Sequence, residues 1–244
     1  MKSMNRTFAV AARVLRQIFN DHRTVALMLA VPSLLTGLFS WMLNNQKQFD
    51  MIGPRLVGLF PFTVMFLLAS IGTLRERQSG TLERFLTMPM RKHEFIVGYA
   101  LAFGLMATIQ AAITMNFAVY VCGLSLNDNY WTLLGAAVSN AILGMSIGLL
   151  ASAFANSEFQ VIQFMPAFIF PQIILGGLFI PIDQMPDLLH TISDWLPLTH
   201  ALRALNDIAS NASATDTYNE IYIVLGVSLG SLILGSLTLR KRTA

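Results

Sequence analysis

Six segments of mainly apolar residues, separated by polar connections, follow one another along the chain. Each is close to the ~20 residues that an α-helix needs to cross the hydrocarbon core of a bilayer. The segments are residues 24–43, 56–74, 95–123, 131–155, 160–180 and 222–239. This pattern predicts an all-α integral membrane protein, with a single six-span transmembrane domain over residues 24–244.

The segment before the first span, residues 1–23, is too polar to cross a membrane but has helical periodicity. At about 100° per residue, its apolar residues gather on one side of a helix. That side carries Phe8, Ala11, Leu15, Ile18 and Phe19, and the other carries Arg6, Arg13, Arg16 and Asn20. We expect an amphipathic helix at the cytoplasmic membrane surface, its basic side toward lipid headgroups or a soluble partner. The alternative is a solvated helical tail that only enforces topology.

Between the fifth and sixth spans, residues 181–220 contain two apolar repeats that are each too short to cross a membrane. The first repeat is Met185, Leu188, Leu189, Ile192 and Trp195, and the second is Leu198, Ala201, Leu202 and Leu205. They predict a short re-entrant or interfacial helical hairpin on the outer side. Because backbone at membrane depth must be covered by protein or water, we expect this hairpin to cap a cavity or close an exit path.

Lysine and arginine are unevenly distributed between the two sides that the spans define. Thirteen of the 16 lie in the termini or in the 75–94 connection, whereas Lys47, Arg55 and Arg203 lie on the other side. Cytoplasmic loops of membrane proteins carry an excess of Lys and Arg. The asymmetry therefore predicts that both termini and the 75–94 loop are cytoplasmic.

The composition agrees with a membrane protein, since 55% of the residues are hydrophobic and only 12% are charged. The net charge is +3, but the basic residues follow the topology and do not form one basic face. A membrane lipid surface is therefore the expected partner, and nucleic acid is not. We expect no cleavable signal peptide, because no small-x-small exit precedes Asn44.

The sequence contains no recognisable source of energy. Ion-coupled carriers generally place ionisable residues at membrane depth, and the six runs hold essentially none well inside them, so a secondary carrier is disfavoured. A P-loop requires Gly-Lys-Ser/Thr, but the four lysines follow Met1, Gln46, Arg91 and Arg240. Any work that the protein does must be powered by another component.

Catalytic and metal-binding constellations are also missing from the sequence. The four histidines form no HExxH motif and no pair at i, i+4. His190 and His200 flank Asp194 and could line an outer metal site, but hydrogen bonding at helix ends is the preferred explanation. We expect no catalytic residue, no cofactor and no metal in this chain.

A charged island, residues 74–94, separates the second and third spans. Gly80 permits a turn, Thr81 is a suitable helix cap, Glu83 suits the first helical turn, and Pro89 ends the helix. The pattern predicts a helix of about two turns over residues 82–88 that exposes Arg84 and Phe85 on the cytoplasmic side. The alternative is an ordinary polar loop between two spans.

The island and several other motifs resemble the ATP-binding-cassette (ABC) type-2 permeases. The likeness is carried by ERQSGTLERFLTMPMRKHEFIVGY (76–99), DHRTVALM (21–28), GGLFIP (176–181), MP (185–186) and LPLTH (196–200). With six spans and cytoplasmic termini, the resemblance covers nearly the whole chain.

The resemblance implies a permease subunit in the plasma membrane of a bacterium. Two permease chains, alike or homologous, would pair, and each would engage a cytoplasmic ATPase subunit that binds ATP and Mg²⁺. Residues 4–20 would be an interface helix and residues 76–88 a coupling helix inserted into a groove of the ATPase. The coupling set is Glu76, Arg77, Gly80, Thr81, Leu82, Glu83, Arg84, Phe85 and Pro89.

The fifth span has the most unusual composition, because it mixes amides, aromatics and prolines. Two prolines should kink or break it and free backbone groups that need a covered or wet surface. Candidate residues of a substrate path are Gln163, Phe164, Pro166, Phe168, Pro171 and Gln172, with Asn116 and Asn140 from the third and fourth spans. For the two asparagines, simple hydrogen bonding between helices is an equally good explanation.

Two GxxxG motifs, Gly144/Gly148 and Gly226/Gly230, predict close helix packing, within the chain in preference to a dimer interface. The leading functional hypothesis is an exporter permease for an amphipathic drug, antibiotic or lipid-like substrate, since the path suits a large amphipath better than a small ion. The alternatives are a polysaccharide or glycolipid exporter permease and a membrane scaffold that transports nothing.

Overall fold

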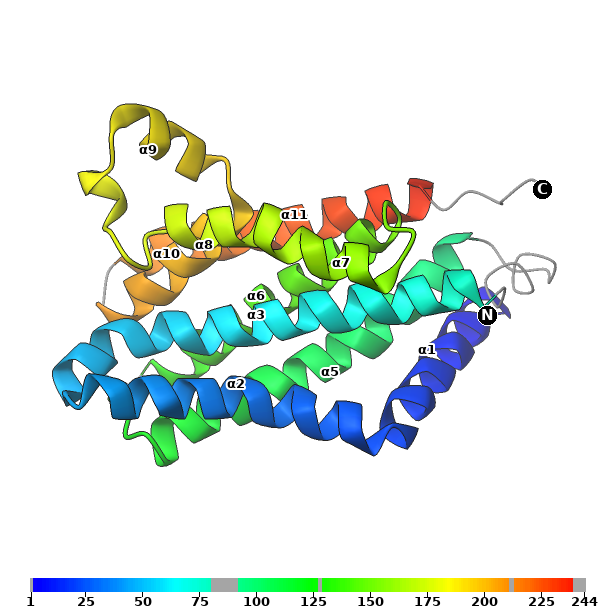
Figure 1. Cartoon of the computed structure of the whole chain (residues 1–244), viewed down its shortest axis with the longest axis horizontal. Coiled ribbons are helices and arrows are strands. Elements are labelled where there is room, and N and C mark those ends of the chain that lie inside the picture. The colour runs from blue at the N-terminus through cyan, green and yellow to red at the C-terminus, as the bar shows by residue number, and fades with distance from the viewer. Residues whose placement is uncertain (1, 80–91, 127–128, 211–212, 239–244) are drawn as a thin grey trace.

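The computed structural model describes residues 2–79, 92–126, 129–210 and 213–238, and this part of the chain is a helical bundle (Figure 1). The α-helices are α1 (Lys2–Asn20), α2 (His22–Leu43), α3 (Gln46–Gln78), α5 (Lys92–Tyr120), α6 (Tyr130–Ser152), α7 (Glu158–Phe164), α8 (Phe170–Leu175), α9 (Asp187–Asp194), α10 (Pro197–Ala209) and α11 (Ala214–Thr238). A π-helical turn, Met165–Ile169, joins α7 to α8, and a 3-10 turn, Ile182–Gln184, precedes α9. Within the described residues, six helical segments are long and apolar enough to cross a membrane. The predicted all-α membrane class is confirmed.

The bundle has two distinct ends. Helix α1 and the last turns of α3 and α11 lie at one end, called the α1 end below, and α9 and α10 lie toward the other, called the hairpin end (Figure 1). Polar residues cap the first turns of α2 and α3, one at each end of the bundle. Asp21 accepts a hydrogen bond from Thr24 N at the start of α2, and Asn45 accepts from Lys47 N and Gln48 N at the start of α3.

The centre of the bundle is the contact between α3 and α6. A Cβ atom at Gly144 or Gly148 would overlap the backbone carbonyl of Phe62 or Phe66, respectively, on α3. These two glycines therefore let the helix backbones approach closely, as predicted for packing within the chain. For the second GxxxG motif the preferred prediction of packing within the chain is wrong, because among the described residues a Cβ at Gly226 or Gly230 in α11 would meet nothing within 4 Å.

The fifth span is broken as its prolines predict. Pro166 lies in the π-helical turn and Pro171 lies near the start of α8. A proline removes one backbone N–H and its ring displaces the preceding turn, so the helix changes its hydrogen-bond register there. Only Val161 and Ile169 of this span are buried in the described bundle, which leaves most of its surface open.

The hairpin between the fifth and sixth spans consists of an exposed helix and a buried one. Helix α10 packs against α3, α6 and α11 through Leu198, Leu202 and Leu205, which are each at most 1% exposed. Helix α9 is exposed, with Leu188 at 72%. Arg55 of α3 holds this hairpin by donating hydrogen bonds to Gly177 O at 2.9 Å and to the Asn206 side chain at 2.5 Å.

Helix α3 corrects one expectation. It begins ten residues before the predicted second span, and Asn45 caps it although its first turn is polar. The added turns contain Arg55, which lies directly before the predicted apolar run that starts at residue 56. Helix α11 likewise begins at Ala214, before the predicted start at residue 222. The prediction began too late because the first turns of α11 carry Asp216 and Glu220 and are therefore polar.

A histidine at the hairpin end makes stability depend on pH. His200 Nδ1 lies 2.5 Å from a Glu220 oxygen on α11, and its Nε2 lies 2.9 Å from Asp194 O. The hydrogen bond to Glu220 raises the pKa of His200 above its ordinary value of 6.5, although burial opposes this shift. The bond contributes its full stability below pH 6.5 and loses it as the pH rises through the raised folded-state pKa.

We therefore expect the thermal unfolding midpoint of the purified protein to fall as the pH rises above 6.5. His200→Gln keeps a polar side chain but does not titrate, so its midpoint should depend less on pH over the same range. Differential scanning fluorimetry of both proteins in detergent measures this difference. Identical pH slopes for the two proteins would show that this ion pair contributes nothing.

Candidate functional site

The candidate site lies at the α1 end, where α1 packs against α5. Val10 and Val14 of α1 are each 3% exposed. Gly98 of α5 permits this contact, because a Cβ there would come within 2.7 Å of Val10 Cγ1 and 3.0 Å of Thr7 O. Phe8, predicted for the apolar side of α1, is 57% exposed.

Arg13 of α1 points into the bundle, although its predicted place is on the outward basic side. Its guanidinium donates to Glu76 Oε1 of α3 at 3.1 Å and to Tyr99 Oη of α5 at 2.8 Å. The Glu76 side chain is only 7% exposed, so a cation beside it offsets the cost of burying its carboxylate. Helical periodicity misplaced Arg13 because it locates apolar faces and carries no information about a buried acid on another helix.

The residues on either side of Glu76 bind other elements. Arg75 donates two hydrogen bonds to the carboxylate of Glu158 in α7, at 2.7 and 3.1 Å. Arg77 donates to the Ser152 carbonyl at the end of α6. Arg75, Glu76 and Arg77, with these partners, are called the α3 junction below.

The α3 junction links the end of one helix to four other helices. Three consecutive side chains connect α3 to α7, to α1 and α5, and to α6. The last described residue before residues 80–91 is Ser79, which directly follows the end of α3. The end of α3 is therefore joined by side-chain hydrogen bonds to α1, α6 and α7.

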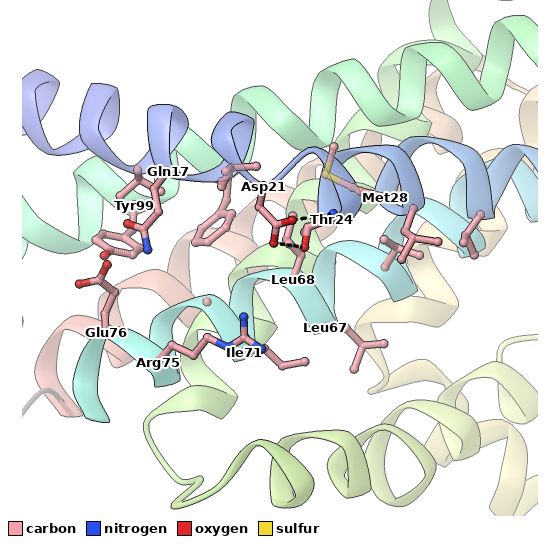
Figure 2. Close-up of a pocket in the computed structure, with 17 residues that line it drawn as sticks. Gln17, Asp21, Thr24, Met28, Leu67, Leu68, Ile71, Arg75, Glu76 and Tyr99 are labelled. Carbon is pink, nitrogen blue, oxygen red and sulfur yellow. Dashed lines mark hydrogen bonds between the residues drawn. The ribbon is translucent and has the colours of Figure 1, made fainter. Parts of the chain in front are cut away.

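A pocket of ≈450 Å³ lies beside the junction, between α1, α2, α3 and α5 (Figure 2). Its walls are mainly apolar, with Met28 on α2 and Leu67 and Leu68 on α3. Its polar residues lie toward the α1 end: Gln17, Asp21, Thr24, Arg75, Glu76 and Tyr99. An apolar cavity with a polar rim suits an amphipathic molecule, whose two parts need the two surroundings.

Asp21 gives this rim a fixed negative charge. Thr24 donates to it from its hydroxyl at 2.5 Å and from its backbone N–H at 3.2 Å, as Figure 2 shows. These hydrogen bonds lower the pKa of Asp21, chiefly through the Thr24 hydroxyl. The carboxylate therefore stays ionised at neutral pH and faces the side of the pocket formed by Ile71 and Arg75.

The predicted coupling residues are divided between the described and undescribed parts of the chain. Glu76 and Arg77 lie in the α3 junction, whereas Gly80, Thr81, Leu82, Glu83, Arg84, Phe85 and Pro89 lie outside the described residues. Of the predicted interface-helix residues, Arg16 is exposed and Arg6 is half-buried. The assignment of all these residues to ATPase contact remains a prediction.

The structure separates the candidate path residues into an open group and an interior group. Gln163, Pro166, Phe168 and Pro171 are exposed and Phe164 and Gln172 are half-buried, all on the fifth span. Asn116 donates to Ala112 O at 2.7 Å and accepts from the Tyr130 hydroxyl at 3.2 Å. Asn140 is fully buried, and neither of its amide atoms has a hydrogen-bond partner in the described structure. The substrate path also remains a prediction.

Sequence reasoning missed Tyr99, Glu158 and Arg55 as functional candidates. No sequence motif marks Tyr99 or Glu158. Each was missed because its partner is an arginine distant in the sequence, Arg13 for Tyr99 and Arg75 for Glu158. Arg55 did give a signal, because it is an isolated cation between Pro54 and the apolar run that starts at Leu56. In the described part of the chain, no three His, Cys, Asp or Glu side chains are arranged to hold a metal ion.

The fold and the α3 junction define a class of protein. It is a multi-pass helical membrane protein in which side-chain hydrogen bonds at the α1 end link the end of α3 to neighbouring helices. Comparison with family models then identifies the family. The model described as "ABC-2 type transporter" matches residues 5–209. The chain belongs to this family.

Three similar proteins are transporters or transporter subunits by name. The chain is 28% identical to ABC transporter G family member 20 of Dictyostelium discoideum, over 78% of this chain and 26% of that protein. It is 24% identical to the probable multidrug ABC transporter permease YbhR of Escherichia coli, over 78% and 52%. It is 26% identical to the linearmycin resistance permease protein LnrN of Bacillus subtilis, over 73% and 47%. The chain therefore matches only about a quarter to a half of each relative.

Proposed function

We propose that this chain is the transmembrane permease subunit of an ATP-driven ABC exporter in a bacterial plasma membrane. It moves an amphipathic drug, antibiotic or lipid-like molecule out of the cytoplasm or inner leaflet, and a separate ATPase subunit supplies the energy. The names of YbhR and LnrN, a probable multidrug and an antibiotic-resistance permease, support this class of substrate. The observation that carries the proposal is the α3 junction beside the predicted coupling segment.

The junction offers a mechanical route from the ATPase to the spans. Closure of the ATPase displaces the coupling segment, and the rigid turn of Arg75, Glu76 and Arg77 passes this displacement to α1, α5, α6 and α7. A flexible connection would absorb such a movement, whereas packed and ion-paired helices shift together. The pocket beside the junction would bind the amphipathic substrate. Movement of α1 or α3 would then change the walls of this pocket.

The distribution of charge supports the proposed orientation in the membrane. The α1 end carries Arg6, Arg13, Arg16, Arg23, Arg75 and Arg77, whereas Lys47, Arg55 and Arg203 are the Lys and Arg of the opposite half. By the positive-inside rule, the α1 end is cytoplasmic and the hairpin end is outside. The open surfaces of α2, α7 and α8 leave room for lipid and for a second permease chain.

Changing both Glu83 and Arg84 to Ala tests the coupling assignment. We expect the double variant to lose most of its ATPase co-purification, or to hydrolyse ATP without transport. Removing two charged side chains from a small helical interface takes away its most directional contacts. The measurement is the amount of ATPase retained on the affinity-tagged permease, followed by ATP hydrolysis and substrate export in proteoliposomes.

The matched control is Lys47→Ala with Asp216→Ala, which also removes one positive and one negative charge. Both residues are exposed and lie at the hairpin end. This control should retain assembly and transport. Normal assembly and transport by the Glu83/Arg84 variant as well would contradict the coupling assignment.

A further inference from the structure

A second hollow lies at the hairpin half of the bundle, between α6 and α11, and has no part in the coupling mechanism. This groove has a volume of ≈540 Å³, and Trp131, Ile142, Tyr222 and Leu225 are among its mainly apolar lining. It is hollow partly because of Gly135, where an added Cβ would meet no atom within 4 Å. Pockets of this size commonly hold small organic molecules.

A smaller polar pocket of ≈190 Å³ adjoins the groove. It is lined by Asn129, Thr132, Asp207, Ile208, Ala214, Thr217 and Tyr218. Thr132 and Tyr218 also line the groove, so the two hollows share a wall. The groove is mainly apolar, and the adjacent pocket is lined by polar side chains.

The polar pocket contains one carboxyl group, that of Asp207. The Asp207 side chain makes no hydrogen bond or ion pair with the described residues, whereas Asp194 pairs with Arg203 and Glu220 pairs with His200. Burial, followed by the charges of Glu220 and Asp216, raises the pKa of Asp207, and the charge of Arg203 opposes this shift. A cationic hydrogen-bond donor would stabilise the ionised carboxylate, because it supplies both a positive charge and a hydrogen bond.

We propose that the groove and the polar pocket form one binding site for an amphipathic cation. A protonated amine binds Asp207, and the attached hydrocarbon part lies in the groove between α6 and α11. Asp216 and Glu220 disfavour an anionic headgroup by repulsion. Because all the named lining residues belong to this chain, binding can be measured without the ATPase and without transport.

Fluorescence quenching measures binding at this site directly, because Trp131 lies in the groove and is 79% exposed. The other two tryptophans, Trp41 and Trp195, are 80% and 84% exposed, and changing both to Phe leaves Trp131 as the only one. The probe is a nitroxide-labelled hexadecylamine, added at pH 7 to the protein in phosphatidylcholine nanodiscs. We expect saturable quenching by the amine and at least about tenfold weaker apparent binding of the matching nitroxide-labelled alcohol.

Asp207→Asn tests the headgroup contact, and it should weaken binding of the amine about tenfold or more. Asp216→Asn removes the same charge from an exposed neighbouring position, and it should change binding less than threefold. Asp207→Glu keeps the charge and should retain binding, which separates loss of contact from misfolding. Equal binding of amine and alcohol, or unchanged binding by Asp207→Asn, would overturn the proposed headgroup contact.

Gly135→Phe tests the groove, because a Cβ at this position has open space around it and the phenyl ring would occupy part of the groove. It should abolish saturable quenching. Gly226→Phe is the matched control, since Gly226 also has open space around it but does not line the groove. If the two variants bind the amine equally well, the groove is not the binding site.

Discussion

Gly144→Leu is expected to lower the free energy of unfolding by roughly 3 kcal/mol or more, since overpacking a close contact forces the backbone to move. Any Cβ at Gly144 would overlap the carbonyl of Phe62, and a backbone atom in the middle of α3 has little freedom to withdraw. The α3–α6 contact lies at the centre of the bundle, so the loss affects the whole fold. The measurement is equilibrium unfolding of the purified protein in mixed micelles.

The same substitution at Gly135 of the same helix is the control. A Cβ there meets nothing within 4 Å, and leucine has a better helix propensity than glycine by up to ~1 kcal/mol. Gly135→Leu should therefore be neutral or slightly stabilising. Equal effects of the two substitutions would mean that close packing at Gly144 does not hold α3 and α6 together.

Arg13→Ala is expected to destabilise the protein by roughly 1–3 kcal/mol, because it leaves a buried carboxylate without its charged partner. Glu76 is 5% exposed, and Arg13 supplies its hydrogen bond at 3.1 Å. The substitution also removes the donor to the Tyr99 hydroxyl. The measurement is the thermal midpoint of the detergent-solubilised protein.

Arg16→Ala provides the comparison on the same helix. Arg16 is exposed, so its removal should change the thermal midpoint little. A double variant, Arg13→Met with Glu76→Gln, removes both charges and should recover much of the stability lost by Arg13→Ala. If Arg13→Ala and Arg16→Ala have the same midpoint, the ion pair does not stabilise the α1 end.

The spans could be predicted from the sequence because a bilayer imposes one simple rule, a long apolar run, on each of them. The ends of the helices could not be predicted in this way, because a polar first turn lowers the hydropathy but can still belong to the helix. Helix α3 begins at Gln46 behind the Asn45 cap, and α11 begins at Ala214 before Asp216. The break in the fifth span was predictable from Pro166 and Pro171, since proline acts on its own helix.

The candidate site was less predictable, because its residues acquire meaning only through distant partners. Gly144 and Gly226 lie in identical GxxxG patterns, yet among the described residues a Cβ at Gly144 would overlap another helix and a Cβ at Gly226 would meet nothing within 4 Å. Arg13 and Arg16 are equivalent in sequence, but within the described part of the chain Arg13 alone of the two pairs with an acid. Periodicity describes one helix at a time, whereas these differences depend on which helix lies opposite.

We propose above that the α3 junction couples ATP hydrolysis to movement of the spans. The most direct test is the number of substrate molecules exported per ATP hydrolysed, measured in proteoliposomes with the partner ATPase for the wild type, Arg13→Ala and Arg16→Ala. If the junction couples the two processes, Arg13→Ala should retain ATP hydrolysis but export several-fold less substrate per ATP, while Arg16→Ala should match the wild type. An unchanged ratio for Arg13→Ala, with export and hydrolysis both retained, would contradict it.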